Sequence, residues 1–167
     1  MRPALKSVVA RWFGAVVVVV AMTATLGAQQ PEKPAAAKKL SPLEAQEFSE
    51  AVGEAALAEL RAGFQSHNAD RVMSVFERGR LAGWSDMRER LENRMASYDS
   101  FRMGYHLVSA TAEGGRGTVV AEVELESVAQ AGVTSPEHRS ATLHLTLERG
   151  PKGWRIVDYS PRGFFTQ

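Results

Sequence analysis

Gly153-Trp154-Arg155-Ile156-Val157-Asp158-Tyr159-Ser160-Pro161 is the stretch that decides the fold of this chain. Its aromatic and β-branched residues are typical of a half-buried strand, and the proline marks where that strand ends. Helical patterns occupy the region before Phe101, and apolar and polar residues alternate from Phe101 onward. Because the helices precede the strands, the order predicts an α+β domain in which this stretch is the last strand.

The first helix is predicted over residues 42–65. Ser41-Pro42-Leu43-Glu44 has the features of a capping box, with proline at the first helical position. Apolar residues then recur every four positions, which places them along one side of a long helix that packs against a large partner. These residues are Phe48, Val52, Ala56, Leu60 and Phe64.

Two further helices are expected before the strands. His67-Asn68-Ala69-Asp70 interrupts the first pattern and supplies a cap for a short second helix. A third helix begins at Ser85-Asp86, beyond a loop bounded by Gly79 and Gly83. Its apolar side is formed by Met87, Leu91, Met95 and Tyr98.

The second half of the domain has the period of two that β-strands show. Gly114-Gly115 and residues 150–153 have the composition of tight turns between strands. The pattern predicts four antiparallel strands in a meander, with an apolar face under the helices and a polar face opposite. The apolar set before the last strand is Phe101, Met103, Tyr105, Leu107, Val119, Ala121, Val123, Leu125, Ala141, Leu143, Leu145 and Leu147.

The first 40 residues are expected to lie outside this domain. Residues 1–28 resemble a signal peptide, with a basic start, an apolar core from Trp12 to Met22 and a cleavage site at Ala28. The core is shorter than the ~20 residues that span a bilayer, which favours cleavage over an uncleaved membrane anchor. Residues 29–40 are predicted to be a disordered linker. We therefore expect an exported protein, periplasmic or secreted, with its domain over 41–167.

Composition excludes several classes of function. Without the three basic residues of the predicted signal segment, the chain has 17 Lys and Arg against 19 Asp and Glu, a net charge of −2. Such a domain has no overall attraction for nucleic acid, and membrane contact is expected only through the signal segment. The arginines between Arg78 and Arg102 alternate with acids, which indicates a solvated surface of mixed charge. The chain has no cysteine, so no disulfide stabilises it.

Two segments carry a resemblance to a known family. Phe64 through Phe76, FQSHNADRVMSVF, resembles the place where a long helix gives way to a short one in the nuclear transport factor 2-like superfamily, which includes ketosteroid isomerase-like and SnoaL-like proteins. Gly153 through Phe165, GWRIVDYSPRGFF, is similar to the terminal strand of such proteins. The resemblance implies a cone-like fold with helices on a curved four-stranded antiparallel sheet. It also implies a pocket between the two layers and a homodimer formed through the sheet.

The resemblance and the strand pattern together select candidate catalytic residues. Asp158 has the same parity as Trp154 and Ile156, so it is a candidate general base in an apolar pocket. The alternative places Asp158 at the sheet rim, hydrogen-bonded in the turn before Pro161. Tyr105 is a candidate hydroxyl donor, or else an aromatic residue of the core. The residues expected to line the pocket are Phe64, Phe76, Trp84, Tyr105 and Trp154.

No metal or cofactor is expected. His106 and His144 have the parity of polar neighbours and so belong to the outer face of the sheet. Together with Glu122 and Glu124 they are an alternative metal set, but no pattern fixes the register between strands that such a site requires.

The sequence supports two candidate functions. The preferred one is a non-catalytic exported module that binds a small apolar ligand or a protein partner, as a homodimer. The alternative is a cofactor-free isomerase, dehydratase or cyclase of the ketosteroid isomerase kind that uses Asp158 and Tyr105. The alternative requires both residues to face one cavity. A sealed interior would favour the binding module, with the space filled by Phe48, Val52, Leu60, Phe76 and Met95.

Overall fold

The computed structural model describes residues 41–129 and 135–167. The predicted signal peptide and linker lie outside the described residues. The described part begins with a 3-10 turn, η1 (Pro42–Glu44), and three helices, α1 (Glu50–Gln65), α2 (Ala69–Ser74) and α3 (Trp84–Ser97). Four strands follow, β1 (Tyr98–Glu113), β2 (Arg116–Ala129), β3 (Glu137–Gly150) and β4 (Gly153–Ser160). Within these residues no helix is long and apolar enough to cross a membrane.

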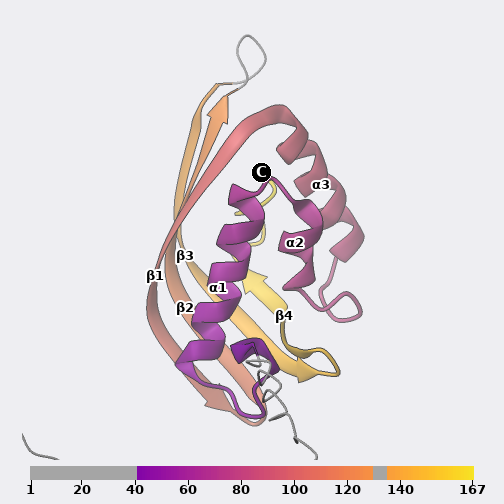
Figure 1. Cartoon of the computed structure of the whole chain (residues 1–167), viewed down its shortest axis with the longest axis vertical. Helices are drawn as coiled ribbons and strands as arrows, with labels where there is room; N and C mark the ends of the chain where they lie inside the picture. Colours follow the sequence, from indigo (N-terminus) through magenta and orange to yellow (C-terminus); the bar gives the residue numbers. More distant parts are fainter. Residues whose placement is uncertain (1–40, 130–134) are drawn as a thin grey trace, which may run out of the picture. The chain divides into compact units, whose positions relative to one another are not determined.

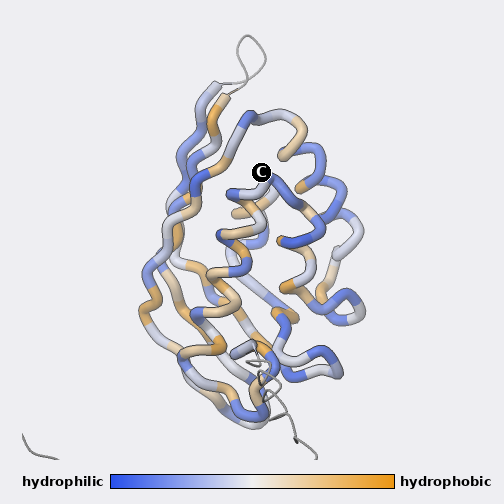
Figure 2. The backbone as a smooth tube through the Cα atoms, viewed as in Figure 1, coloured by the Kyte–Doolittle hydropathy of each residue, from blue (hydrophilic) through white to orange (hydrophobic). Residues whose placement is uncertain are grey.

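The strands form one antiparallel sheet in the order β1-β2-β3-β4, as the meander prediction requires. Figure 1 shows the sheet curving around α1, with the three helices on its concave side. Apolar and polar residues alternate along the strands, as the colours in Figure 2 show. The predicted inner positions of β2 and β3 are correct, because Val119, Val123 and Leu145 are completely buried. The predicted α+β architecture is therefore confirmed.

The predicted continuous helix over 42–65 is wrong in its first part. The capping box exists, since Ser41 N donates to Glu44 Oε2 at 3.1 Å, but it closes only the short turn η1. Tertiary contacts end this turn, because Trp154 Nε1 donates to the carbonyl oxygen of Ala45 at 3.1 Å. Gly153 also packs so closely on η1 that a Cβ there would lie 2.2 Å from the Leu43 oxygen. The chain therefore bends at Gln46 and Glu47 and is not helical again until α1 begins at Glu50.

A β-bulge changes the parity of the last strand. Leu147 pairs with Ile156 and the preceding Thr146 pairs with Asp158, so Val157 is an extra residue in β4. A bulge of this kind reverses which side chains face inward beyond it. Tyr159 is consequently buried, whereas the side chain of Asp158 is 58% exposed. The expectation that Asp158 shares the inward face of Trp154 is wrong for this reason.

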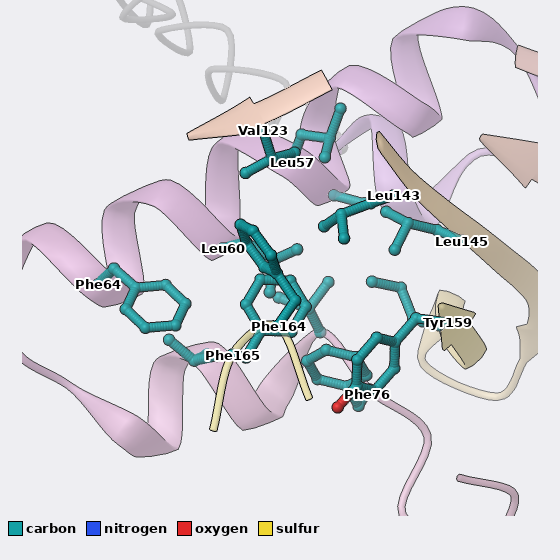
Figure 3. Close-up of a cluster of buried hydrophobic side chains, with 14 of the residues drawn as sticks. Leu57, Leu60, Phe64, Phe76, Val123, Leu143, Leu145, Tyr159, Phe164 and Phe165 are labelled. Atoms are coloured by element: carbon teal, nitrogen blue, oxygen red, sulfur yellow. The ribbon is translucent and has the colours of Figure 1, made fainter. Parts of the chain in front are cut away.

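The space between the helices and the sheet is filled by side chains. Val52, Leu60, Phe76 and Met95 are buried there, and Phe48 packs edge-on against Trp154 with ring centroids 5.2 Å apart. The segment after β4 turns back into the same space and contributes Phe164 and Phe165. The Phe165 ring lies 5.8 Å from Phe64 and 5.4 Å from Tyr159, an arrangement visible in Figure 3. A packed aromatic cluster thus stands where the resemblance implies an internal pocket.

Candidate functional site

The five residues predicted to line one pocket are distributed over three places. Phe64 and Trp154 are buried in the core. Tyr105 lies partly buried on the edge strand β1, with the guanidinium of Arg61 5.2 Å from its ring centroid. Phe76 and Trp84 come together at a surface pocket beside α3. The structure therefore assembles two of the five residues into one site.

Asp158 and Tyr105 do not share a cavity in the described part of the chain. Asp158 lies on β4 and Tyr105 on β1, the two edges of the sheet. Three strand spacings of about 4.8 Å put roughly 14 Å between these edges. Asp158 accepts hydrogen bonds from Tyr159 N, at 2.8 Å, and from the guanidinium of Arg162. These partners are those of the rim position that the sequence allowed as the alternative.

The pocket that contains Phe76 and Trp84 is built where four segments meet. Residues 75–77 run along the free edge of β4, since Ile156 N donates to Val75 O and Glu77 N donates to Ile156 O, both at 2.9 Å. The helix α2, the start of α3 and the β3–β4 hairpin complete the walls, and the pocket has a volume of about 360 Å³. This volume lies at the lower end of the range of small-molecule sites.

Trp84 is the aromatic centre of this pocket. The guanidinium carbons of Arg78 and Arg88 lie 4.9 Å and 5.6 Å from its ring centroid, within cation–π range. Its indole Nε1 is buried and has no hydrogen-bond partner among the described residues. Trp84 is the first residue of α3, and Gly83 before it offers no side-chain cap to the helix N-terminus. The uncapped start of α3 therefore lies in the wall of the pocket, whereas the indole Nε1 is buried from solvent.

The charges around Trp84 are mainly positive. Arg88 is held by Asp70, at 2.6 Å, and by Glu92, at 2.7 Å. The hydrogen bond that Arg88 donates to Glu92 and the charge of Asp70 raise the pKa of Arg88 above its usual value. Other lining cations make no ion pair with any described residue, namely Arg78, Lys152 and Arg155. Since Asp70 is engaged by Arg88, Glu77 is the lining acid left to balance them.

A second polar cluster lies at the other end of α3. Arg94 is 7% exposed and donates to Ser127 Oγ at 2.8 Å and to Glu137 Oε2 at 2.9 Å. Burial alone would raise the pKa of Glu137, but the guanidinium groups of Arg94 and Arg139 outweigh burial and hold that pKa below its usual value. Burial and the like charge of Arg139 lower the pKa of Arg94. This cluster ties α3 to β2 and β3.

The sequence interpretation of a solvated mixed-charge surface is wrong for Arg94. The residue follows Leu91 by three positions on α3, so it lies near the buried side of that helix. Arg78 and Arg88 do lie at the surface, yet they gather on one aromatic ring, which the charge pattern does not predict. The only indication of this arrangement in the sequence is that arginines occur within a few residues of Trp84.

The outer face of the sheet carries a polar hollow with a volume of about 600 Å³. Its lining includes His106, Glu122 and Glu124, as the predicted parity places them, together with Tyr105. Within the residues described here, no group of histidines and acids is arranged to hold a metal ion.

Comparison with solved structures identifies the fold. A nuclear transport factor 2-like superfamily protein from Salmonella enterica superposes with a TM-score of 0.53 at 13% identity, over 62% of this chain and 82% of that chain. A protein from Planctomyces limnophilus gives 0.55 at 8% identity, over 64% and 88%. A candidate dehydratase of the same family from Streptomyces avermitilis gives 0.50 at 12% identity, over 62% and 88%.

The described domain therefore has the nuclear transport factor 2-like fold, in agreement with the resemblance of its two sequence segments. No protein-family model matches the sequence, and no curated protein is significantly similar to it. At these identities the comparisons show the fold alone, and function has to be argued from the site.

Proposed function

We propose that this protein is an exported, non-catalytic binding or interaction module whose ligand site is the pocket around Trp84. The observation that carries the proposal is the contrast between a filled interior and this surface pocket. Phe164 and Phe165 occupy the space between helices and sheet, whereas Trp84 and Phe76 line a pocket of about 360 Å³. A pocket with an aromatic wall and a few polar groups is the usual form of a small-molecule site.

The geometry argues against the alternative, an isomerase, dehydratase or cyclase that uses Asp158 and Tyr105. A general base of this kind needs a desolvated carboxylate within reach of the substrate. Asp158 is solvent-exposed, pairs with Arg162 and lies across the whole sheet from Tyr105. The enzyme hypothesis in this form requires one small substrate to contact both Asp158 and Tyr105, and their separation prevents this.

Export and homodimerisation are the other parts of the proposal. The signal-like residues 1–28 support export, and intact-mass analysis of the exported protein should show a chain that begins after Ala28. A retained Met1 would contradict cleavage. The convex face of the sheet carries no helix (Figure 1), which leaves it available to a second copy. Light scattering should report twice the mass of the chain, and a strict monomer at high concentration would contradict the dimer.

The binding function is tested by thermal unfolding with a panel of small aromatic compounds. A ligand at one hundred times its Kd stabilises the folded state by about 2.7 kcal/mol, a readily measured shift in Tm. At least one compound should raise Tm for the natural protein and not for Trp84→Ala. Trp84→Phe, which keeps a ring, should retain part of the shift. Turnover of any compound that binds would contradict the non-catalytic assignment.

A further inference from the structure

We infer that the Trp84 pocket recognises a small carboxylate that carries an aromatic or aliphatic body. The inference rests on the proposed binding function and adds the chemical class of the ligand to it. It follows from three properties of the pocket, which are an excess of unpaired cations, a set of N–H donors and an apolar lining.

The first property is charge. Arg78, Lys152 and Arg155 line the pocket without an ion pair to any described residue. The fourth lining cation, Arg88, is paired with Asp70 and Glu92, which leaves Glu77 as the lining acid that opposes the other three. The uncompensated charge in the pocket is therefore positive, and an anion is the ligand that it attracts.

The second property is the set of hydrogen-bond donors. Guanidinium groups present paired N–H donors whose spacing matches the two oxygens of a carboxylate. Arg155 already gives one donor, Nη1, to the carbonyl oxygen of Trp154 at 2.8 Å, so the donors available to a ligand are those of Arg78 and the remaining ones of Arg155.

The apolar lining of the pocket favours a carboxylate that carries an aromatic or aliphatic group over an inorganic anion. Met73, Phe76 and Trp84 line the pocket with apolar surface. An inorganic anion leaves that surface in contact with water, whereas an aromatic or aliphatic body covers it and gains the hydrophobic contribution. The volume of about 360 Å³ suits a ligand of this size.

The test uses titration calorimetry of the mature protein with four probes. Benzoate combines the carboxylate and the ring, benzamide keeps the ring without the charge, and acetate and inorganic phosphate keep charge without the ring. We expect benzoate to bind at least about tenfold more tightly than each of the other three, since charge-assisted hydrogen bonds are roughly twice as strong as neutral ones. Benzoate affinity should also fall as salt is added.

Two variants remove pocket cations that have no ion pair to lose. Lys152→Gln lies in the exposed β3–β4 hairpin and Arg78→Gln in the loop before α3, so neither change disturbs the core. Each should weaken benzoate several-fold and leave benzamide unchanged. Arg90→Gln is the matched control, because Arg90 is an exposed arginine of α3 that does not line this pocket.

The outcomes separate the inference from the proposed function. If benzamide binds as tightly as benzoate, or if the two variants bind benzoate like the control, the carboxylate class is overturned and the binding function stands. If inorganic phosphate matches benzoate, the site is for bare anions and the inference also fails. If none of the probes binds and the wider aromatic panel also fails, the proposed function itself is contradicted.

Discussion

The interior beneath the sheet and the pocket around Trp84 are both lined by aromatic residues, yet they are suited to opposite tasks. In the interior, the ring of Phe165 packs on those of Phe64 and Tyr159, and the Tyr159 hydroxyl donates to the Arg162 carbonyl oxygen at 2.7 Å. At the pocket, the Trp84 ring lies against arginines, and its N–H has no hydrogen-bond partner in the described part of the chain. The fold alone therefore does not locate the site, because the layer between helices and sheet here contributes stability.

The largest expected effect comes from opening the interior. Phe165→Ala removes a fully buried ring and should reduce the free energy of unfolding by about 3–5 kcal/mol. Trp84→Ala, at the half-exposed pocket, should cost much less. Denaturant unfolding of both variants compares the two regions directly. A cost for Phe165→Ala below that for Trp84→Ala would break the distinction between a structural interior and a functional surface pocket.

A smaller loss is expected where the hairpin beside the pocket meets η1. Gly153 has φ +88° and no space for a Cβ, which would lie 2.2 Å from the Leu43 oxygen. Gly153→Ala should therefore cost about 2–3 kcal/mol, measured by thermal unfolding. Gly114→Ala is the matched control, because Gly114 also has positive φ but faces open space, and it should cost about 1 kcal/mol. Equal costs would mean that the contact with η1 does not constrain the hairpin.

The acid stability of the domain tests the buried cluster that supports the far end of α3. The pKa of Glu137 is lower in the folded protein than its ordinary value, so its ionised form stabilises the fold. This contribution should be complete above about pH 5 and should be lost as the pH falls below the ordinary range of a glutamate. Unfolding free energies of the natural protein and Glu137→Gln should therefore converge towards pH 3. A constant difference between them would contradict this role.

The smallest effect is expected at Asp158. Its ion pair with Arg162 is exposed, and such pairs contribute less than about 1 kcal/mol. Asp158→Asn should leave both unfolding and ligand binding nearly unchanged, measured by thermal unfolding and calorimetry. A large loss of binding with the fold intact would return Asp158 to the candidate site and revive the catalytic alternative.

The regular parts of this fold were predictable because local pattern and tertiary structure agree. Alternation located the inner faces of β2 and β3, and Asn68 does cap α2 by accepting a hydrogen bond from Arg71 N at 2.9 Å. The failures occur where a distant contact overrides the local pattern. Trp154 holds the Ala45 carbonyl away from a helix, and one extra residue, Val157, turns Asp158 outward.

Only part of the candidate site could be predicted from the sequence, for the same reason. Phe76 and Trp84 were named as pocket residues, but the pocket depends on residues 75–77 running along β4, a contact between segments about 80 residues apart. The cations contributed by Arg78, Lys152 and Arg155 come from both segments. Their convergence on one pocket is a property of the tertiary structure, and the sequence indicates only that arginines occur near Trp84.

The most direct test of the central claim follows the two indole N–H signals of the domain by NMR during a benzoate titration. Trp84 marks the surface pocket and Trp154 marks the packed interior, where its Nε1 is bonded to the Ala45 oxygen. A ligand that binds at the pocket should shift the Trp84 signal progressively and leave the Trp154 signal in place. A shift of Trp154 together with signals from the Phe64–Phe165 cluster, with Trp84 unmoved, would place the ligand in the interior and contradict the account.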